Sequence, residues 1–214
     1  MQFARLILYG LFAATAACGA IEPAPAAEES VAIVGATVIY PERDGAKASE
    51  PDSTIVISGR RIIAVGPSSA VVVPQKSAVL DARGKWVIPG LIDGHVHFFQ
   101  SGNLYTRPDV VDFTRAVPYA KEVARNQSRL SATFKVWLAS GVTSVVDIGG
   151  PFWNFEMRDA AERSPEAPRV AVAGPLLSMI ADPKLDLGDP PIIEITSTET
   201  ARDLVRRELA RKPD

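Results

Sequence analysis

A change of rhythm after Trp86 constrains the fold of this 214-residue chain more than any other feature. Before it, short runs rich in β-branched residues alternate with turn residues and predict strands only. After it, apolar strand-like runs alternate with amphipathic stretches, and glycines follow at Gly141, Gly149, Gly150 and Gly174. Repeated strand–helix units imply a parallel sheet or barrel, because parallel strands need a crossover connection. The sequence therefore predicts a small all-β unit followed by an α/β unit.

The all-β unit is predicted over residues 27–87. Residues 31–40 alternate in polarity and predict a strand, and residues 41–52 predict a loop. The runs 53–58 and 61–65 flank a tight turn at Gly59 and Arg60, which predicts a hairpin. Further short strands are expected at 71–73 and 78–80. Such a sheet is marginal alone, so another layer or domain is expected to cover it.

The α/β unit is predicted over residues 88–214. The apolar run 86–92 predicts a buried strand that ends at His97, and further buried strands are expected at 142–148 and 169–173. Helical spacing predicts one helix over 117–140 and shorter ones later, with a long loop over 174–195. A complete eight-fold barrel takes about 250 residues, roughly twice what is present here. We therefore expect this chain to be the N-terminal portion of a longer protein.

Both histidines of the chain lie in one three-residue stretch, His95-Val96-His97. Side chains at i and i+2 of a strand point the same way, so both imidazoles can project from one face toward one ion. Histidine is the commonest neutral metal ligand. The alternative is a pair of hydrogen-bonded imidazoles at a strand end. The pattern makes His95 and His97 candidate metal ligands.

Two carboxylates lie close to these histidines in the predicted sheet. Asp93 shares the face of His95, and either orients a ligand histidine or accepts from loop backbone donors. Asp147 lies near the end of the second strand, and either supports the site or substrate or hydrogen-bonds to the turn at Gly149 and Gly150. Four loop residues expected on the same face are candidate substrate contacts or ordinary loop residues: Tyr105, Arg107, Trp153 and Asn154.

The first residues resemble an export signal. Arg5 precedes an apolar stretch over residues 6–17, and small residues follow, so residues 1–26 are predicted to be a signal peptide. The stretch is too short to span a bilayer comfortably. Cys18, the only cysteine, is either removed with the signal or acylated, which would attach the protein to a membrane. We expect an exported, periplasmic or secreted protein, or a lipoprotein.

The segment Pro89-Gly90-Leu91-Ile92-Asp93-Gly94-His95-Val96-His97 resembles the signature of the amidohydrolase superfamily, metal hydrolases built on a (β/α)8 barrel. Residues 59–66 and 80–87 resemble the small β-sandwich that flanks the barrel in many members. Residues 141–150 and 168–175 resemble the second and third barrel strands of the subgroup with imidazolonepropionase-like and prolidase-like enzymes. The resemblance implies a partial TIM-type barrel, about the first three βα units, preceded by a small β-sandwich domain.

The same resemblance implies that His95 and His97 bind the more buried divalent metal, usually zinc, in a site with one or two ions. The other family ligands are a lysine on the fourth strand, histidines on the fifth and sixth, and an aspartate on the eighth that serves as general base. These residues are expected beyond Asp214, so this chain alone is expected to be inactive.

The function implied by the resemblance is hydrolysis of C–N bonds by a metal-activated water. Small-molecule substrates are expected: a dipeptide, an N-acyl amino acid or a cyclic amide. A formal net charge of −2 gives no sign of nucleic-acid binding, which needs a basic patch. Two alternatives stay open, a non-catalytic binding or structural protein and a barrel deaminase. The sequence leaves open whether the protein is a homo-oligomer.

Overall fold

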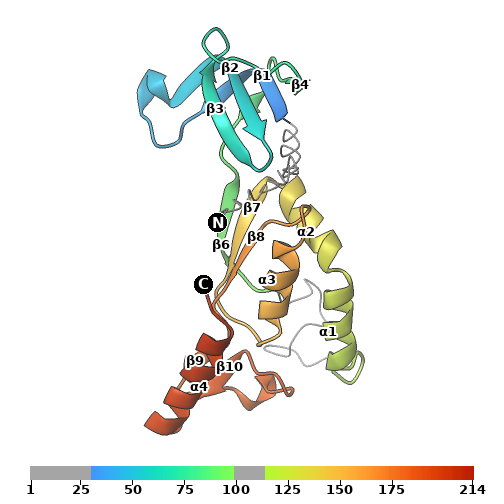
Figure 1. Cartoon of the computed structure of the whole chain (residues 1–214). Coiled ribbons are helices and arrows are strands. Elements are labelled where there is room, and N and C mark those ends of the chain that lie inside the picture. The colour runs from blue at the N-terminus through green and yellow to red at the C-terminus, as the bar shows by residue number, and fades with distance from the viewer. Residues whose placement is uncertain (1–29, 99–113) are drawn as a thin grey trace, which may run out of the picture. The chain divides into compact units, whose positions relative to one another are not determined.

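The computed structural model describes residues 30–98 and 114–214. They fall into two compact units that divide between Ile88 and Pro89, and each unit is described by itself (Figure 1). The predicted signal peptide with Cys18, together with Tyr105 and Arg107, lies outside the described residues. Within the described part of the chain, every helix is too short or too polar to cross a membrane.

The first unit is one five-stranded sheet. Its strands lie in the order β3-β2-β1-β4, and β5 also pairs with β1. The β1–β2 and β2–β3 pairs are antiparallel, whereas β4 and β5 run parallel to β1. The elements are β1 (Ser30–Ile39), the 3-10 turn η1 (Gly45–Ala48), β2 (Ser49–Ser58), β3 (Arg61–Pro67), β4 (Ala78–Asp81) and β5 (Trp86–Val87).

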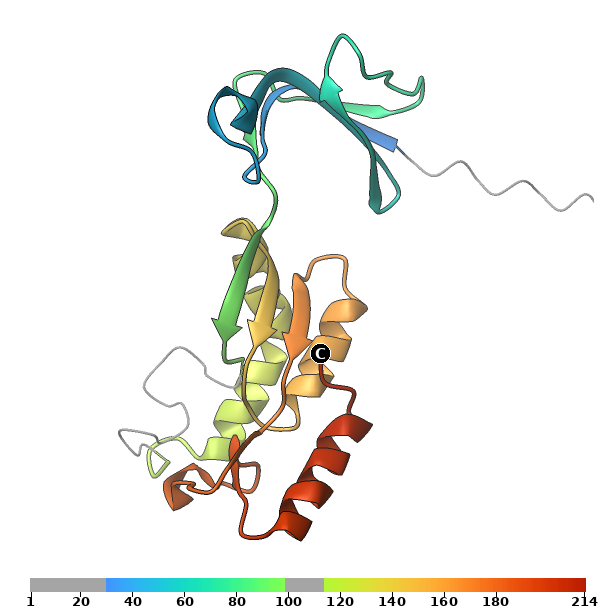
Figure 2. The same ribbon diagram turned by 90° about the vertical axis from the view of Figure 1, so that its left-hand side faces the viewer.

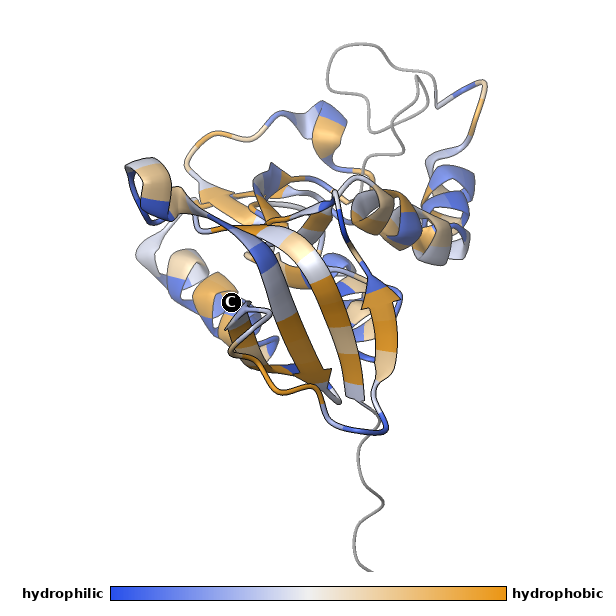
Figure 3. Ribbon diagram, turned by 90° about the horizontal axis from the view of Figure 1, so that it is seen from above, coloured by the Kyte–Doolittle hydropathy of each residue, from blue (hydrophilic) through white to orange (hydrophobic). Residues whose placement is uncertain are grey.

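The predicted hairpin is confirmed, because Ser58 of β2 pairs with Arg61 of β3 around Gly59, whose φ is 54°. A positive φ suits glycine, which has no Cβ to clash. The strands of this sheet contain many hydrophobic residues (Figure 3). Val56 is buried, whereas Ile62 and Val79 are exposed. Large apolar side chains of the sheet therefore remain uncovered.

The second unit combines a parallel sheet with helices, which confirms the predicted α/β class. Strands β6, β7 and β8 are parallel and lie in that order. Helices α2 and α3 lie against one face of the sheet (Figure 2), and α1 contacts α2. The elements are β6 (Leu91–Val96), α1 (Tyr119–Ser128), α2 (Leu130–Ala139), β7 (Val142–Asp147), α3 (Asn154–Glu162), β8 (Arg169–Val172), β9 (Leu176–Ser178), η2 (Pro183–Leu185), β10 (Ile192–Glu194) and α4 (Thr198–Ala210).

A hydrophobic core joins the sheet to these helices. Val145 of the central strand β7 is 1% exposed and packs in one cluster with Phe134 of α2 and Met157 of α3. Val96 and Phe98 extend the cluster from the end of β6. Burial of a large apolar side chain contributes roughly 1.5–3 kcal/mol. This core therefore fixes the end of β6 against β7 and the helices.

The predicted buried strand over residues 86–92 is wrong. Trp86 and Val87 form β5 in the first unit, and β6 begins only at Leu91 in the second. Pro89 lies between them and has no N–H to donate to a ladder. Trp86 and Ile92 are 68% and 72% exposed. An apolar run alone did not reveal that the chain changes sheet here.

The single helix predicted over residues 117–140 is two helices, which meet at Arg129. The Ser128 hydroxyl donates to the Arg125 carbonyl at 2.8 Å, and Arg129 N–H is shared between the Arg125 and Asn126 carbonyls. A serine that bonds back to a carbonyl competes with the helix ladder. Helical periodicity continues through such a break, so the sequence pattern missed it.

Three smaller predictions are also corrected. Residues 71–73 form no strand, because a turn follows β3 in which Ala70 and Val71 donate to the Pro67 carbonyl. The predicted loop 41–52 contains η1 and the start of β2. The predicted loop 174–195 contains β9 and β10, which pair in parallel.

The two glycines of the Pro89–His97 segment differ in their surroundings, which yields a test. A Cβ at Gly90 would overlap the Thr143 side chain on β7, whereas a Cβ at Gly94 would meet no atom within 4 Å. We expect G90A to cost about 1–3 kcal/mol of unfolding free energy through overpacking. The matched G94A variant should change it by less than about 0.5 kcal/mol.

Denaturant unfolding of the purified variants measures the difference. The double variant G90A/T143A should recover part of the loss, because it removes the two Thr143 atoms nearest to the added methyl group. Equal destabilisation by G90A and G94A would contradict the close approach of β6 and β7 at Gly90.

Candidate functional site

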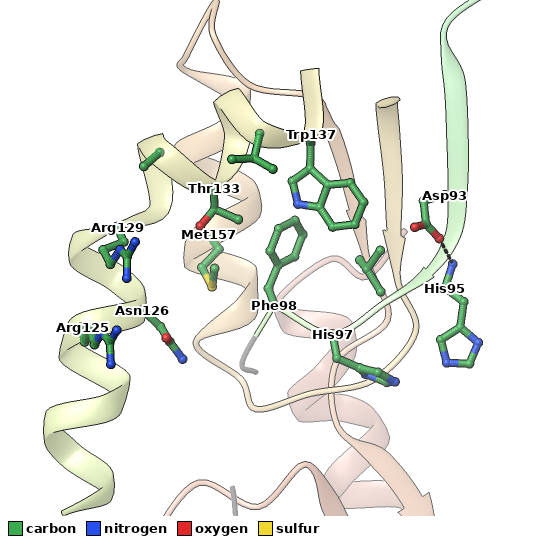
Figure 4. A pocket seen from close by; sticks show the side chains of 13 residues that line it. Asp93, His95, His97, Phe98, Arg125, Asn126, Arg129, Thr133, Trp137 and Met157 are labelled. Carbon is green, nitrogen blue, oxygen red and sulfur yellow. Dashed lines mark hydrogen bonds between the residues drawn. The ribbon is translucent and has the colours of Figure 1, made fainter. Parts of the chain in front are cut away.

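The histidine pair lies where β6 ends. His95 is the penultimate residue of β6, and His97 follows its last residue, Val96. Val96 and Phe98 are buried in the core, whereas His95 is exposed and His97 is partly buried. Alternation along an extended chain separates these two sets. The imidazoles therefore project away from the hydrophobic core (Figure 4).

A hydrogen bond orients the His97 ring. Its Nδ1 lies 2.8 Å from the carbonyl oxygen of Gly149, in the turn after β7. A carbonyl oxygen only accepts, so this contact assigns the proton to Nδ1 and the lone pair to Nε2. Metal-binding histidines commonly donate their second ring nitrogen in this way. The surroundings of His97 therefore match those of a histidine that binds metal through Nε2.

The spacing of the two rings also fits a shared ion. The ring centres of His95 and His97 are 5.2 Å apart and the ring planes are 81° from parallel. Two imidazoles on one tetrahedral zinc, with Zn–N bonds of about 2.0–2.1 Å, hold their ring centres roughly 5 Å apart. The pair can therefore supply two ligands. Among residues 30–98 and 114–214, no group of three or more His, Cys, Asp or Glu side chains has the arrangement of a metal site.

Asp93 contacts the main chain of the histidine pair. Its Oδ1 accepts from the backbone N–H of His95 at 3.1 Å. The sequence predicts two roles for Asp93: to orient a ligand histidine or to accept from backbone donors. This contact matches the second role. The bond holds the backbone at the end of β6, from which the His95 side chain projects.

Asp147 is fully buried at the end of β7 and accepts from three donors. Its Oδ1 accepts from Gly149 N–H at 3.2 Å, and its Oδ2 accepts from Asn154 Nδ2 at 2.6 Å and Phe98 N–H at 3.3 Å. Burial raises the pKa of this carboxyl above its usual range, and these hydrogen bonds and His97 oppose the rise. The bond to the Gly149 turn is one of the roles expected from the sequence.

The Gly149 turn is closely packed. A Cβ on Gly149 would meet the Leu176 side chain of β9 at 3.0 Å. In addition, Gly150 N–H donates to the Gly174 carbonyl after β8. The turn that holds His97 is therefore supported from the next strand as well as by Asp147.

A cavity of about 520 Å³ opens between the end of β6 and helices α1 and α2 (Figure 4). Sequence analysis did not connect these helices with the histidines, because helical spacing does not indicate which polar residues face a strand end. Polar side chains from the helices line it beside the apolar Phe98, Trp137 and Met157: Arg125, Asn126, Arg129 and Thr133.

Asp189 is a further residue that sequence analysis missed. It accepts from Trp153 Nε1 at 2.8 Å and from the Tyr119 hydroxyl at 3.1 Å. It thereby joins the connections that follow β6, β7 and β8. Trp153, a candidate substrate contact, is half-buried and bound to this carboxylate. Asn154, another candidate, is fully buried as the first residue of α3 and donates to Asp147.

Known enzymes are similar to parts of this chain in sequence and in fold. The chain is 30% identical over 104 residues to an imidazolonepropionase of Rhizobium meliloti, covering 47% of this chain and 24% of the relative. It is 40% identical over 67 residues to adenine deaminase 3 of the same organism, covering 31% and 10%. A solved structure of a proposed prolidase from Bifidobacterium longum matches with a TM-score of 0.62 and 27% identity over 88% of this chain and 40% of that one.

These relatives support assignment of the chain to the amidohydrolase superfamily. No family model matches it, so the assignment rests on these relatives and on the fold. The chain spans between a tenth and a quarter of the length of the two curated relatives named above. The structure of ochratoxinase from A. niger, at 20% identity and a TM-score of 0.63, shares the fold.

Removal of the Asp189 carboxylate tests its role in joining the three connections. We expect D189A to cost about 1–3 kcal/mol of unfolding free energy, because the partly buried Trp153 N–H and Tyr119 hydroxyl lose an acceptor. Asp186 provides a matched control in the same loop, since it is exposed and its side chain accepts a local bond from the Gly188 N–H. D186A should change stability by less than about 0.5 kcal/mol.

Urea unfolding gives the free energies, and limited proteolysis reports on the loop itself. Faster cleavage within residues 179–191 is expected in D189A only. If both variants are cleaved at the wild-type rate, the loop does not depend on Asp189.

Proposed function

We propose that this chain carries the first part of a metal-dependent hydrolase that breaks C–N bonds. One observation carries the proposal: two imidazoles lie edge to face at the carboxyl end of β6, with ring centres 5.2 Å apart. The Gly149 carbonyl leaves Nε2 of His97 with the lone pair that a metal ligand needs. The similarity to enzymes of the amidohydrolase superfamily supports the same assignment.

The proposed metal is a divalent ion, with zinc favoured by the two imidazoles. When bound, it would supply an activated water and polarise the scissile carbonyl. The chain's own contribution is to hold the ion through His95 and His97 and to orient His97 through Gly149. We infer that the remaining ligands and the general base lie beyond Asp214, in a longer protein.

The same comparisons support a proposed architecture. Strands β6, β7 and β8 would be the first three strands of a (β/α)8 barrel, whose carboxyl ends carry the active site. The five-stranded sheet would be part of a flanking β-sandwich domain over residues 27–87, with the barrel starting at residue 88. Residues 1–26 would act as an export signal. Sequencing the N-terminus of the exported protein tests this, because a mature chain that still begins at Met1 contradicts it.

The proposed substrates are small molecules with a hydrolysable amide: a dipeptide, an N-acyl amino acid or a cyclic amide. The similarity to imidazolonepropionases and to a proposed prolidase supports this class. Deamination is a second candidate, because two adenine deaminases are 36% and 40% identical over 67 residues. The matches to enzymes do not favour the non-catalytic alternative.

Metal analysis of the full-length protein tests the ligand assignment. We expect one or two divalent ions per chain by mass spectrometry, and a large loss of metal in the H95A/H97A variant, because two of the ligands are gone. D81N is a suitable control, since Asp81 is an exposed carboxylate of the first unit that pairs with Arg83. Metal content that stays unchanged in the double variant would contradict the assignment.

A substrate panel then tests the reaction. Dipeptides, N-acyl amino acids, imidazolone propionate and adenine should be offered to the metal-loaded protein and to the H95A/H97A variant. We expect hydrolysis of one amide class, lost in the variant. Release of ammonia from adenine alone would favour the deaminase alternative.

A further inference from the structure

The Asp147 carboxylate accepts hydrogen bonds from two main-chain N–H groups beside His97, one on Phe98 and one on Gly149. The peptide N–H of Phe98, which directly follows His97, donates to Asp147 Oδ2. The peptide of Gly149 donates its N–H to Asp147 Oδ1, and the carbonyl of the same residue accepts from His97 Nδ1. The carboxylate therefore reaches both the backbone and the ring of His97 through two short paths.

These contacts leave little freedom to the groups involved. Asp147 and Asn154 are both 0% exposed, so no solvent can replace a lost hydrogen bond. Leu176 packs against Gly149 from β9. Hydrogen bonds that follow one another in a chain strengthen each other, and the effect is largest where the groups are buried.

We propose that Asp147 is a positioning residue that fixes the orientation and the tautomer of His97 through the turn at Gly149. With the turn held, the Gly149 carbonyl faces His97 Nδ1 and retains the ring in its Nδ1–H form. His97 then presents Nε2 to the site. The value of this arrangement for metal binding rests on the proposed function, but the tautomer itself is a property of the metal-free protein.

The carboxyl group is the part of Asp147 that this role requires. Three N–H groups from Phe98, Gly149 and Asn154 converge on it. In D147N, the side-chain amide has one oxygen for three donors, and its own NH₂ group faces at least one of them. We therefore expect the turn to move and the Gly149 carbonyl to lose its bond to His97.

Nitrogen NMR of the imidazoles tests the proposal directly. Long-range ¹H–¹⁵N spectra of the metal-free full-length protein contain one ring system for each histidine, and the variants H95A and H97A assign the signals of His95 and His97. At a pH where both rings are neutral, wild-type His97 should be in the Nδ1–H form. A wild-type His97 in the Nε2–H form would overturn the proposal without any Asp147 variant.

Two variants separate positioning from simple stabilisation. D147N should shift His97 toward the Nε2–H form and leave His95 unchanged. N154A is the matched control, because it removes one bond to Asp147 but keeps those to Gly149 and Phe98. N154A should lower stability yet leave the His97 tautomer as in the wild type. A folded D147N protein with His97 still fully Nδ1–H would overturn the proposal.

An exchange variant keeps the test available if D147N does not fold. D147N/N154D retains one carboxylate and one amide in the buried pair but moves the charge away from Gly149. It should show the same tautomer shift, and an unchanged Nδ1–H form would overturn the proposal.

Zinc titration of the full-length protein gives a second readout. Loss of a group that orients a metal-binding histidine typically weakens metal affinity about 10–100-fold. We expect this loss in D147N or the exchange variant, and near wild-type affinity in N154A. A wild-type protein that binds no zinc would contradict the proposed function, while the tautomer measurement would still decide the role of Asp147.

Discussion

The parallel register between β6 and β7 is the constraint on which the rest of the second unit depends. Val96 pairs with Asp147, so the residues that follow both strands emerge at one edge of the sheet. His97 thereby lies beside Gly149, fifty-two residues further along the chain. The core around Val145 and Phe134 fixes the two strands against the helices. Without this register, the imidazole would lack its acceptor and the Asp147 carboxyl would lack one of its donors.

The sequence predicted this part of the fold well, because its signals are local and strong. Gly141, which follows α2 with a φ of 81°, marks the start of β7. The run that became β7 lies between Gly141 and Gly149, and the run that became β8 lies between Pro168 and Gly174. The histidine pair stands out because the chain has no other histidine. Alternation along an extended strand was enough to predict that both rings leave the same face.

Other parts depend on contacts that periodicity does not encode. The chain changes sheet between Trp86 and Leu91, where Pro89 interrupts the strand. Tertiary contacts, rather than local periodicity, determine this change. The break at Arg129 arises from a serine hydroxyl that bonds to a main-chain carbonyl. Asp189 was missed because its partners, Tyr119 and Trp153, are 70 and 36 residues away. Nothing in a loop rich in proline and aspartate distinguishes that one carboxylate.

Leu176 packs on Gly149, and the Gly149 carbonyl bonds to His97. The orientation of the His97 imidazole therefore depends on the β9–β10 segment. Any side chain that changes volume at position 176 presses on, or releases, the peptide that holds His97. Substitutions in the β9–β10 segment would therefore alter the orientation of His97 without replacing either histidine of the candidate site. In the proposed hydrolase, metal affinity would then depend on a residue outside the histidine pair.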